Sequence, residues 1–150
     1  MGEGIMKKLI GILSVMLLLL GVGSTGATVI DFDNVPGAIA GNINNLIPNG
    51  YGGLDWTNMY VLSRGTHSGS GYDTGIVSGD WVGYNGFGGL AVTSSAGDFD
   101  FNGAYFTSAW YDDNVLTIKA FDDDILVFIT TAAINTKGPQ WITANFTSID

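Results

Sequence analysis

Large aromatic side chains beside glycine and short polar residues are the part of this sequence best suited to holding a ligand. The first such segment is 51–56 (YGGLDW). Glycine lets a loop turn sharply and lets a ligand come close to the backbone. Tyr51 and Trp56 could therefore stack on a sugar ring, with Asp55 accepting hydrogen bonds from its hydroxyls. The alternative is that both rings fill one end of a hydrophobic core, which is the commoner fate of large aromatics.

A second group of aromatic and amide side chains lies in the glycine-rich stretch that follows. Its members combine ring faces with a hydrogen-bonding amide: Tyr72, Trp81, Tyr84, Asn85 and Phe87. Rings supply contact area and polar groups supply orientation, a combination that suits a neutral glycan. The same set suits an ordinary protein contact patch, and the solvent exposure of Trp81 distinguishes an open platform from buried packing. The sequence thus predicts a ligand-binding surface between Tyr51 and Phe87.

Acidic side chains suggest a metal site as well. Asp31 and Asp33 lie near the start of the mature chain and Asp150 lies at its end, so the three would meet if the terminal segments pair. Calcium takes several oxygen ligands from carboxylates and backbone carbonyls. We therefore predict these three residues as ligands of calcium, against the alternative of solvated turn carboxylates. The latter interpretation is favoured for 112–113 and 122–124, because Asp is common in turns.

Catalytic chemistry has few residues to use. His67 is the only histidine, and although Ser68 or Ser70 could be drawn beside it, no nucleophile-elbow motif supports a triad. A glycosidase with two carboxylates remains open as an alternative, with Asp serving as acid and nucleophile. We predict that the protein is not an enzyme.

The first 27 residues have the layout of a secretory signal peptide. Lys7 and Lys8 precede an apolar run, and Thr25 and Ala27 have the small-residue spacing of a cleavage site. The expected product begins at Thr28 and is secreted, with no membrane insertion after cleavage. A retained N-terminal membrane anchor is the alternative, although the apolar run is shorter than the roughly 20 residues that span a bilayer.

The charge of the predicted mature chain excludes one class of partner. Three basic residues, Arg64, Lys119 and Lys137, stand against thirteen Asp and no Glu, a net charge of −10. A nucleic-acid-binding protein needs a cationic face, so no nucleic-acid partner is expected. The chain has no cysteine, which excludes disulfides, thiolate zinc sites and a cysteine nucleophile within it.

The pattern of the mature chain predicts one antiparallel β-sandwich domain, residues 28–150. Glycine, Thr, Ser, Asn and aromatics are abundant, and no helical period persists over three turns; only 37–46 could form a helical turn. We expect a bulge near Asn102 and Gly103 and a hairpin at 122–124. The predicted core holds Phe32, Phe99, Phe101, Phe106, Leu116, Ile118, Val127, Ile129, Ile142 and Phe146. The predicted strands are 28–33, 60–62, 74–78, 90–94, 99–110, 115–121, 125–131 and 141–149.

Several of these segments resemble a group of exported bacterial proteins that often carry a PEP-CTERM sorting tail. The similarity covers nearly the whole mature chain and rests on 29–33, 47–56, 70–72, 77–80, 82–85 and 99–102. Those proteins look like jelly-roll domains akin to carbohydrate-binding modules, so the resemblance implies a jelly-roll, galactose-binding-like fold. This sequence departs from their pattern after Ile149 and Asp150, where it lacks the sorting tail and a final strand. The expectation is a domain truncated at its C-terminal strand and released rather than anchored.

Together these features predict a secreted, non-catalytic domain that binds a polysaccharide or other component of a cell surface or matrix. Two alternatives stay open at this point: a structural protein without a small ligand, and the Asp-based glycoside hydrolase. Exposed Tyr72, Trp81 or Tyr84 beside a groove would favour binding. Burial of all these rings would favour a structural role, and two Asp facing across a cleft would favour hydrolysis.

Overall fold

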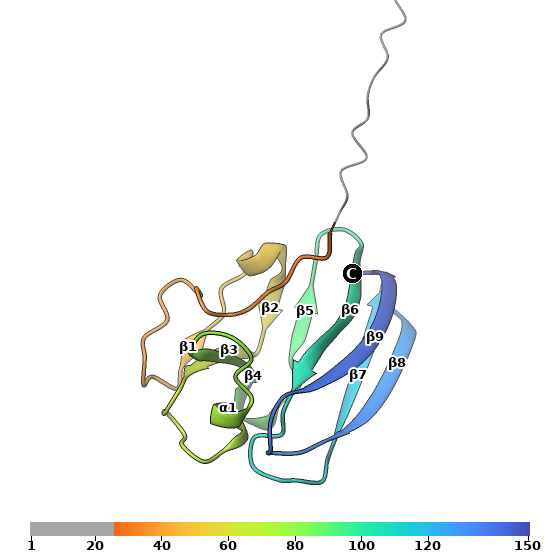
Figure 1. Ribbon diagram of the computed structural model, residues 1–150. Helices are drawn as coiled ribbons and strands as arrows, with labels where there is room; N and C mark the ends of the chain where they lie inside the picture. The colour runs from red at the N-terminus through yellow and green to blue at the C-terminus, as the bar shows by residue number, and fades with distance from the viewer. Residues whose placement is uncertain (1–25) are drawn as a thin grey trace, which may run out of the picture.

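The computed structural model describes residues 26–150, so the predicted signal peptide lies outside the described residues except for its last two positions. The described chain is all-β, and its strands pair antiparallel in four small sheets (Figure 1). Short helical turns lie at Tyr51–Gly53, Gly71–Thr74 (α1) and Gly86–Gly88. The strands are β1 (Asn45–Leu46), β2 (Asp55–Thr57), β3 (Met59–Ser63), β4 (Trp81–Asn85), β5 (Val92–Ser94), β6 (Phe99–Phe106), β7 (Asn114–Asp122), β8 (Ile125–Ile134) and β9 (Gln140–Ile149).

The sheets form two lobes, each with its own small core. The first lobe, residues 26–98, contains the sheet β1-β3-β4 and the pair β2-β5. Its core is built on the buried side chains Val35, Ile47, Trp56 and Val61, against which the partly buried Phe32, Tyr51 and Trp81 pack. Val61 and Leu62 on β3 are both almost fully buried, although they point to opposite faces. β3 is therefore covered on both sides and anchors this lobe.

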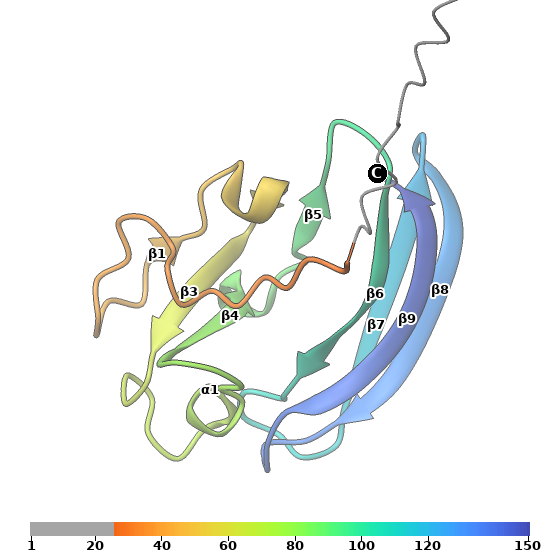
Figure 2. The same cartoon turned by 45° about the horizontal axis from the view of Figure 1, so that its top comes forward.

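The second lobe, residues 99–150, consists of two long antiparallel ribbons, β6-β9 and β7-β8. Its core is centred on Ala120, Phe146 and Ile149, and the ring of Phe128 stacks on Phe146 with centroids 5.1 Å apart. Ile118, Phe99, Phe101 and Ala144 complete it. The ribbons curve side by side in both views (Figures 1 and 2).

Turn chemistry explains the shape of these ribbons. Asp123 and Asp124 connect β7 to β8 with positive φ angles of 48° and 64°, the geometry of a two-residue hairpin turn. The register between β6 and β9 shifts between Phe101 and Gly103, where the sequence predicts a bulge, but the extra residue is on β9, which has two residues, 144 and 145, opposite Asn102. The hairpin and the place of the bulge are thus both confirmed.

The lobes are joined where α1 contacts the loop after β6; we call this contact the joint. The Gly71 amide donates to the Ala109 carbonyl at 2.8 Å, and the Thr74 hydroxyl donates to the Thr136 carbonyl at 2.5 Å. Ser108 is 2% exposed, and its hydroxyl accepts from the Asn114 amide at 2.7 Å. Backbone and side-chain hydrogen bonds therefore hold the lobes together at this end of the molecule (Figure 2).

The first predicted strand, 28–33, is wrong. This segment is irregular, and Phe32 has a positive φ of 64°. The Asp31 carboxylate accepts from the Asp33 amide at 3.1 Å, a local bond that takes the place of a strand ladder. The segment still serves the core, because Ile30 and Phe32 pack against the first lobe.

Two further local predictions fail for related reasons. The segment 74–78 is not a strand: Ser70 caps the short helix α1 by accepting from the Tyr72 amide, and irregular chain follows. The region 37–46 is a series of turns rather than a helix, because the buried Asn45 amide donates to the carbonyls of Ile39 and Asn42 at 2.9 and 2.8 Å. Side chains that satisfy backbone groups displaced the predicted regular structure in both places.

The predicted core is right in part. Phe146 is buried, and Phe32, Phe99, Phe101 and Ile118 pack against buried clusters. Val127 and Ile129 are wrong, since they are 42% and 57% exposed. Strand β8 directs Phe128 inward, which turns its two neighbours outward by the two-residue period of a strand. The antiparallel β-sandwich is confirmed, while the jelly-roll order of strands stays a prediction.

Candidate functional site

A long cleft of about 2330 Å³ lies between the two lobes; its lining begins at the joint, with Gly71 and Ser108, and includes core residues of both lobes such as Trp56 and Phe146. The first lobe contributes the segment 26–32 and strand β4 to its walls, and the second lobe contributes β6 and β7. The lobes diverge in the view of Figure 2, with α1 at the end where they meet. The cleft exceeds the roughly 300–1,000 Å³ of a typical small-molecule site. It is large enough to hold a chain rather than a single small molecule.

An aromatic row runs from the cleft wall to the joint. It consists of Phe87, Tyr60, Tyr84, Tyr72, Trp110 and His67, and all but Tyr60 line the cleft. Successive ring centroids, taken from Phe87 to Trp110, lie 5.9, 5.6, 5.4 and 5.6 Å apart. Most neighbours meet edge to face, the arrangement that aromatic quadrupoles favour. The row is therefore pre-organised by its own packing.

Different elements position the members of this row. Tyr60 and Tyr84 are paired residues on β3 and β4, whereas Tyr72 stands on α1. His67 and Trp110 both pack on Tyr72 with centroids 5.6 Å away. Because Trp110 belongs to the second lobe and the others to the first, the row crosses the joint.

The ends of the row are open to solvent. Phe87 is 75% exposed and Trp110 is 57% exposed, whereas Tyr72 and Tyr84 are partly buried. Burial raises the pKa of the Tyr72 phenol above its ordinary value, and a hydrogen bond with Trp110 partly offsets that rise. Burial also raises the pKa of Tyr84, and electrostatic interactions with Tyr72 and Tyr60 raise it further. These phenols therefore stay uncharged at neutral pH and offer ring faces and hydroxyl groups.

The structure brings together some of the predicted site residues. Tyr72, Trp81, Tyr84 and Asn85 all border the cleft and are all partly or fully exposed. Tyr60 and Trp110 are not among the predicted site residues, because their surroundings in the sequence do not distinguish them from core aromatics. No local signal could have found Trp110, because its partner Tyr72 lies 38 positions earlier in the chain.

Tyr51 and Trp56 belong to the core of the first lobe. Trp56 is 9% exposed, and its indole N–H donates to the Tyr51 carbonyl at 2.8 Å. The ring of Phe32 meets Trp56 edge to face at 5.6 Å and stacks on Tyr51 at 6.2 Å. Asp55 is exposed at the start of β2 and does not border the cleft. Both rings are therefore part of the core, although Trp56 and its neighbours Gly52, Gly53 and Leu54 also border the cleft, and the ligand role of this segment stays a prediction.

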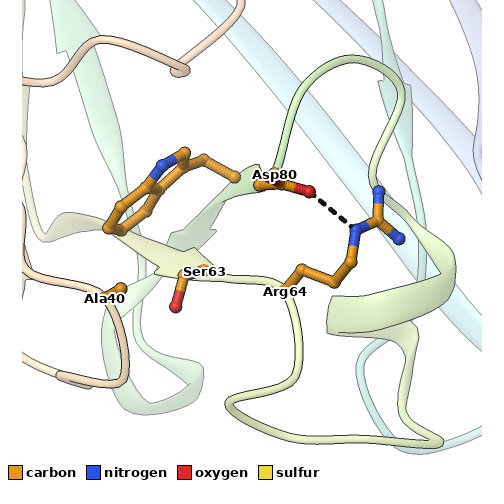
Figure 3. Close-up of a pocket in the computed structure, with 5 residues that line it drawn as sticks. Ala40, Ser63, Arg64 and Asp80 are labelled. Carbon is orange, nitrogen blue, oxygen red and sulfur yellow. Dashed lines mark hydrogen bonds and ion pairs between the residues drawn. The ribbon is translucent and has the colours of Figure 1, made fainter.

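Trp81 is partly buried and divides its surface between two environments. It packs on the core of the first lobe, and it also lines a shallow hollow of about 390 Å³ with Ala40, Ser63, Arg64 and Asp80. Figure 3 shows the Arg64–Asp80 ion pair across this hollow, with 2.9 Å between Nε and Oδ1. The Arg64 guanidinium also donates to the Gly79 carbonyl. Its charge is compensated by these partners, so the hollow offers little to an anion.

The predicted calcium ligands do not come together as a metal site. Within residues 26–150 no group of three or more His, Asp or Glu side chains could hold a metal ion. Asp33 accepts from the Ser78 hydroxyl at 3.0 Å through Oδ2. The Asp150 amide donates to the Phe121 carbonyl at the end of β7, in the other lobe. The three-carboxylate set with Asp31 is thus not formed, because 28–33 does not pair with the C-terminal strand.

The residues considered for a catalytic triad have structural roles. The Ser70 hydroxyl donates to the His67 backbone carbonyl at 2.6 Å and caps α1. The His67 ring lies between Tyr72 and Trp110. Three carboxylates border the cleft, those of Asp31, Asp100 and Asp150. The Asp100 carboxylate accepts from the Ser148 amide at 3.0 Å.

No helix within the described residues is both long and apolar enough to cross a membrane. Comparison with known proteins found no matching family model, no matching curated protein and no matching solved structure. The similarity to exported PEP-CTERM-associated proteins therefore stays a prediction from the sequence.

Proposed function

We propose that this protein is a secreted, non-catalytic module that binds an uncharged polysaccharide chain in the cleft between its lobes. The observation that carries the proposal is the aromatic row, whose exposed ends at Phe87 and Trp110 border a cleft of about 2330 Å³. Sugar rings have apolar C–H faces and polar edges. A binding site for them needs aromatic surface together with a few orienting polar groups.

The cleft supplies both kinds of contact. Trp110 and Phe87 offer aromatic surface at opposite ends of the row, and the partly buried Tyr72 and Tyr84 extend it along the wall. The exposed Asn85 amide stands beside them, with its Nδ2 donating to the Gly89 carbonyl at 2.8 Å. Within the described residues the Asn85 Oδ1 accepts no hydrogen bond, so it can accept one from a sugar hydroxyl.

The charge of the protein favours a neutral ligand over an acidic one. The predicted mature chain carries −10, and the cleft is bordered by Asp31, Asp100 and Asp150 against the single cation Lys119. A uronate or sulfate polymer would approach a surface of its own sign, at a cost that falls with added salt. Neutral polysaccharides meet no such barrier.

The test is retention of the full chain, as secreted, on insoluble cellulose and chitin, with alginate beads as the acidic comparison. Trp110→Ala and Phe87→Ala should each weaken retention on the neutral polymer about tenfold, which corresponds to about 1.4 kcal/mol. Ile129→Ala is the control, because Ile129 is 57% exposed on β8 and does not border the cleft. The control should bind like the unmodified protein.

Three results would argue against the proposal. The first is no retention on any neutral polymer, as a purely structural protein would show. The second is retention that neither aromatic substitution changes. The third is release of reducing sugar from the polymer during the assay, which would support the hydrolase alternative instead.

A further inference from the structure

A second aromatic feature lies on the β6-β9 ribbon. Tyr105 and Trp141 are directly paired across the two strands, and their rings meet edge to face with centroids 5.1 Å apart. They are 51% and 50% exposed. They share no ring contact with the aromatic row, and both border the margin of the cleft. We call this pair the sheet platform.

The Trp141 ring is held in place on its strand. Its indole N–H donates to the Thr143 hydroxyl at 3.0 Å. A Cβ placed on Gly103 would lie 2.9 Å from Cζ2 of Trp141, so the ring rests over a position where only glycine leaves room. Gly103 has a φ of 150° and lies next to the register shift between β6 and β9. This glycine thus leaves room for the indole, and Tyr105 supports its edge.

The indole N–H of Trp141 already has a hydrogen-bond partner. With the N–H bonded to Thr143, the exposed half of Trp141 offers apolar ring surface without a free donor. Exposed Asn102 and Asn145 lie on the same two strands and carry amide groups. The nearest carboxylate on β6, that of Asp100, accepts from the Ser148 amide. A fixed, exposed ring suits a flat, uncharged partner with an apolar face.

We infer that the sheet platform is a second sugar-binding site, which stacks the C–H face of one pyranose ring of a neutral polysaccharide on Trp141. This inference extends the proposed function but depends on different residues. Rings with equatorial hydroxyls, as in cellulose and chitin, present such a flat C–H face. Two sites on one domain would raise retention on a polymer through effective concentration, beyond the affinity of either site alone.

The test follows the indole N–H signals of the ¹⁵N-labelled full chain by NMR during addition of cellohexaose and, separately, chitohexaose. Trp141→Phe and Trp110→Phe assign two of the four tryptophan signals. We expect both the Trp141 and the Trp110 signals to shift as sugar is added. In the retention assay, Trp141→Ala should weaken binding to the matching insoluble polymer about tenfold, close to 1.4 kcal/mol.

Two further variants separate stacking from folding. Thr143→Val keeps the ring but removes the acceptor for its N–H, and it should weaken retention by a factor of about three, less than 1 kcal/mol. Leu126→Ala is the control, because Leu126 is a 48% exposed apolar residue on β8 that lies outside both the platform and the cleft. It should leave the Trp141 signal responsive to sugar.

The outcomes distinguish this inference from the proposed function. If the Trp110 signal shifts while Trp141 stays unmoved and Trp141→Ala binds normally, the cleft binds sugar and the platform is overturned. If only Trp141 responds, the platform stands and the cleft proposal falls. If neither signal shifts with either hexasaccharide and no polymer retains the protein, both are overturned.

Discussion

Gly71 lies at the joint, and its missing side chain sets how closely the lobes approach. Its amide donates to the Ala109 carbonyl, and a Cβ added there would lie 1.7 Å from the Ser108 carbonyl oxygen. Ser108 in turn receives the Asn114 amide and bonds through its own amide to the Asn135 carbonyl. One glycine thus permits a contact on which the positions of Tyr72 and Trp110 depend.

Gly71→Ala should therefore destabilise the protein by about 1–3 kcal/mol, the usual cost of inserting atoms where no space exists. The measurement is urea unfolding followed by tryptophan fluorescence. Gly97→Ala is the control, since a Cβ at that exposed turn meets nothing within 4 Å; it should change stability by no more than about 0.5 kcal/mol. Equal stability of the two variants would show that the lobes do not meet as described.

The four tryptophans show how far residue roles can be predicted from sequence. Burial of Trp56 follows from general tendency, and the structure confirms it. Trp110 is the exposed end of the row, but its role depends on His67 and Tyr72, which come close only in the folded chain. The binding surface between Tyr51 and Phe87 in the first lobe stays a prediction from the sequence. Sequence spacing could not identify contributions from the second lobe, because contacts between the lobes leave no local pattern.

At the scale of elements, regular alternation was the dependable signal. Strands β7 and β9 match their predictions closely, because Leu116, Ile118 and Ala120 and then Ile142, Ala144 and Phe146 alternate with polar residues. The glycine-rich region was harder. Strands β2 and β4 were not predicted, although Trp81 and Val82 have high strand propensity. Short strands of this kind are fixed by their partners rather than by their own residues.

Asp112 ties two of these elements together across a loop. Its Oδ1 accepts from the Thr136 amide and hydroxyl at 3.1 and 2.5 Å, and Lys137 Nζ lies 3.6 Å from Oδ2. The hydrogen bonds with Thr136, with a smaller contribution from Lys137, hold the pKa of this carboxyl below its ordinary value. The loop before β7 is thereby linked to the turn between β8 and β9, beside the joint.

The lowered pKa predicts the direction of a pH effect. A carboxyl whose pKa is lower in the folded state stabilises the fold at pH values above its unfolded pKa of about 4, and this stabilisation is lost as the pH falls through the folded value. Asp112→Asn should lower Tm at pH 6, and the difference from the unmodified protein should shrink towards pH 2. Asp98→Asn, at an exposed turn, controls for the general relief of negative charge. A Tm difference that is the same at both pH values would contradict the link.

Considered as a whole, the molecule buries its apolar residues in two small clusters and leaves a cleft between them. The clusters share no residue, and within residues 26–150 the strands of one lobe pair with none of the other. Exposed apolar side chains such as Leu90 (85%) and Phe87 (75%) border that cleft. The sequence predicted the sandwich from its alternation, but the separation of its two halves is a property of the packed molecule.

An open cleft of this composition predicts that the native protein binds a hydrophobic dye. Nile red is the suitable probe because it is uncharged, whereas an anionic dye would be repelled by a chain of net charge −10. We expect enhanced, blue-shifted dye emission at pH 7 and at temperatures below unfolding. The exposed apolar side chains that border the cleft offer the dye a surface of a kind that is rare on soluble monomers. A hexasaccharide that binds the cleft should displace the dye and, at about 100 times its Kd, should stabilise the fold by about 2.7 kcal/mol.

Two substitutions identify where the dye binds. Leu90→Ser should weaken dye binding because Leu90 borders the cleft, whereas Ile125→Ser should not, because Ile125 is 66% exposed on β8 and lies outside it. Dye emission that appears only as the protein melts would mean that the lobes are closed in solution. In that case Trp110 and Phe87 would not be open to a polysaccharide without a prior opening of the joint, and binding would be slower than diffusion allows.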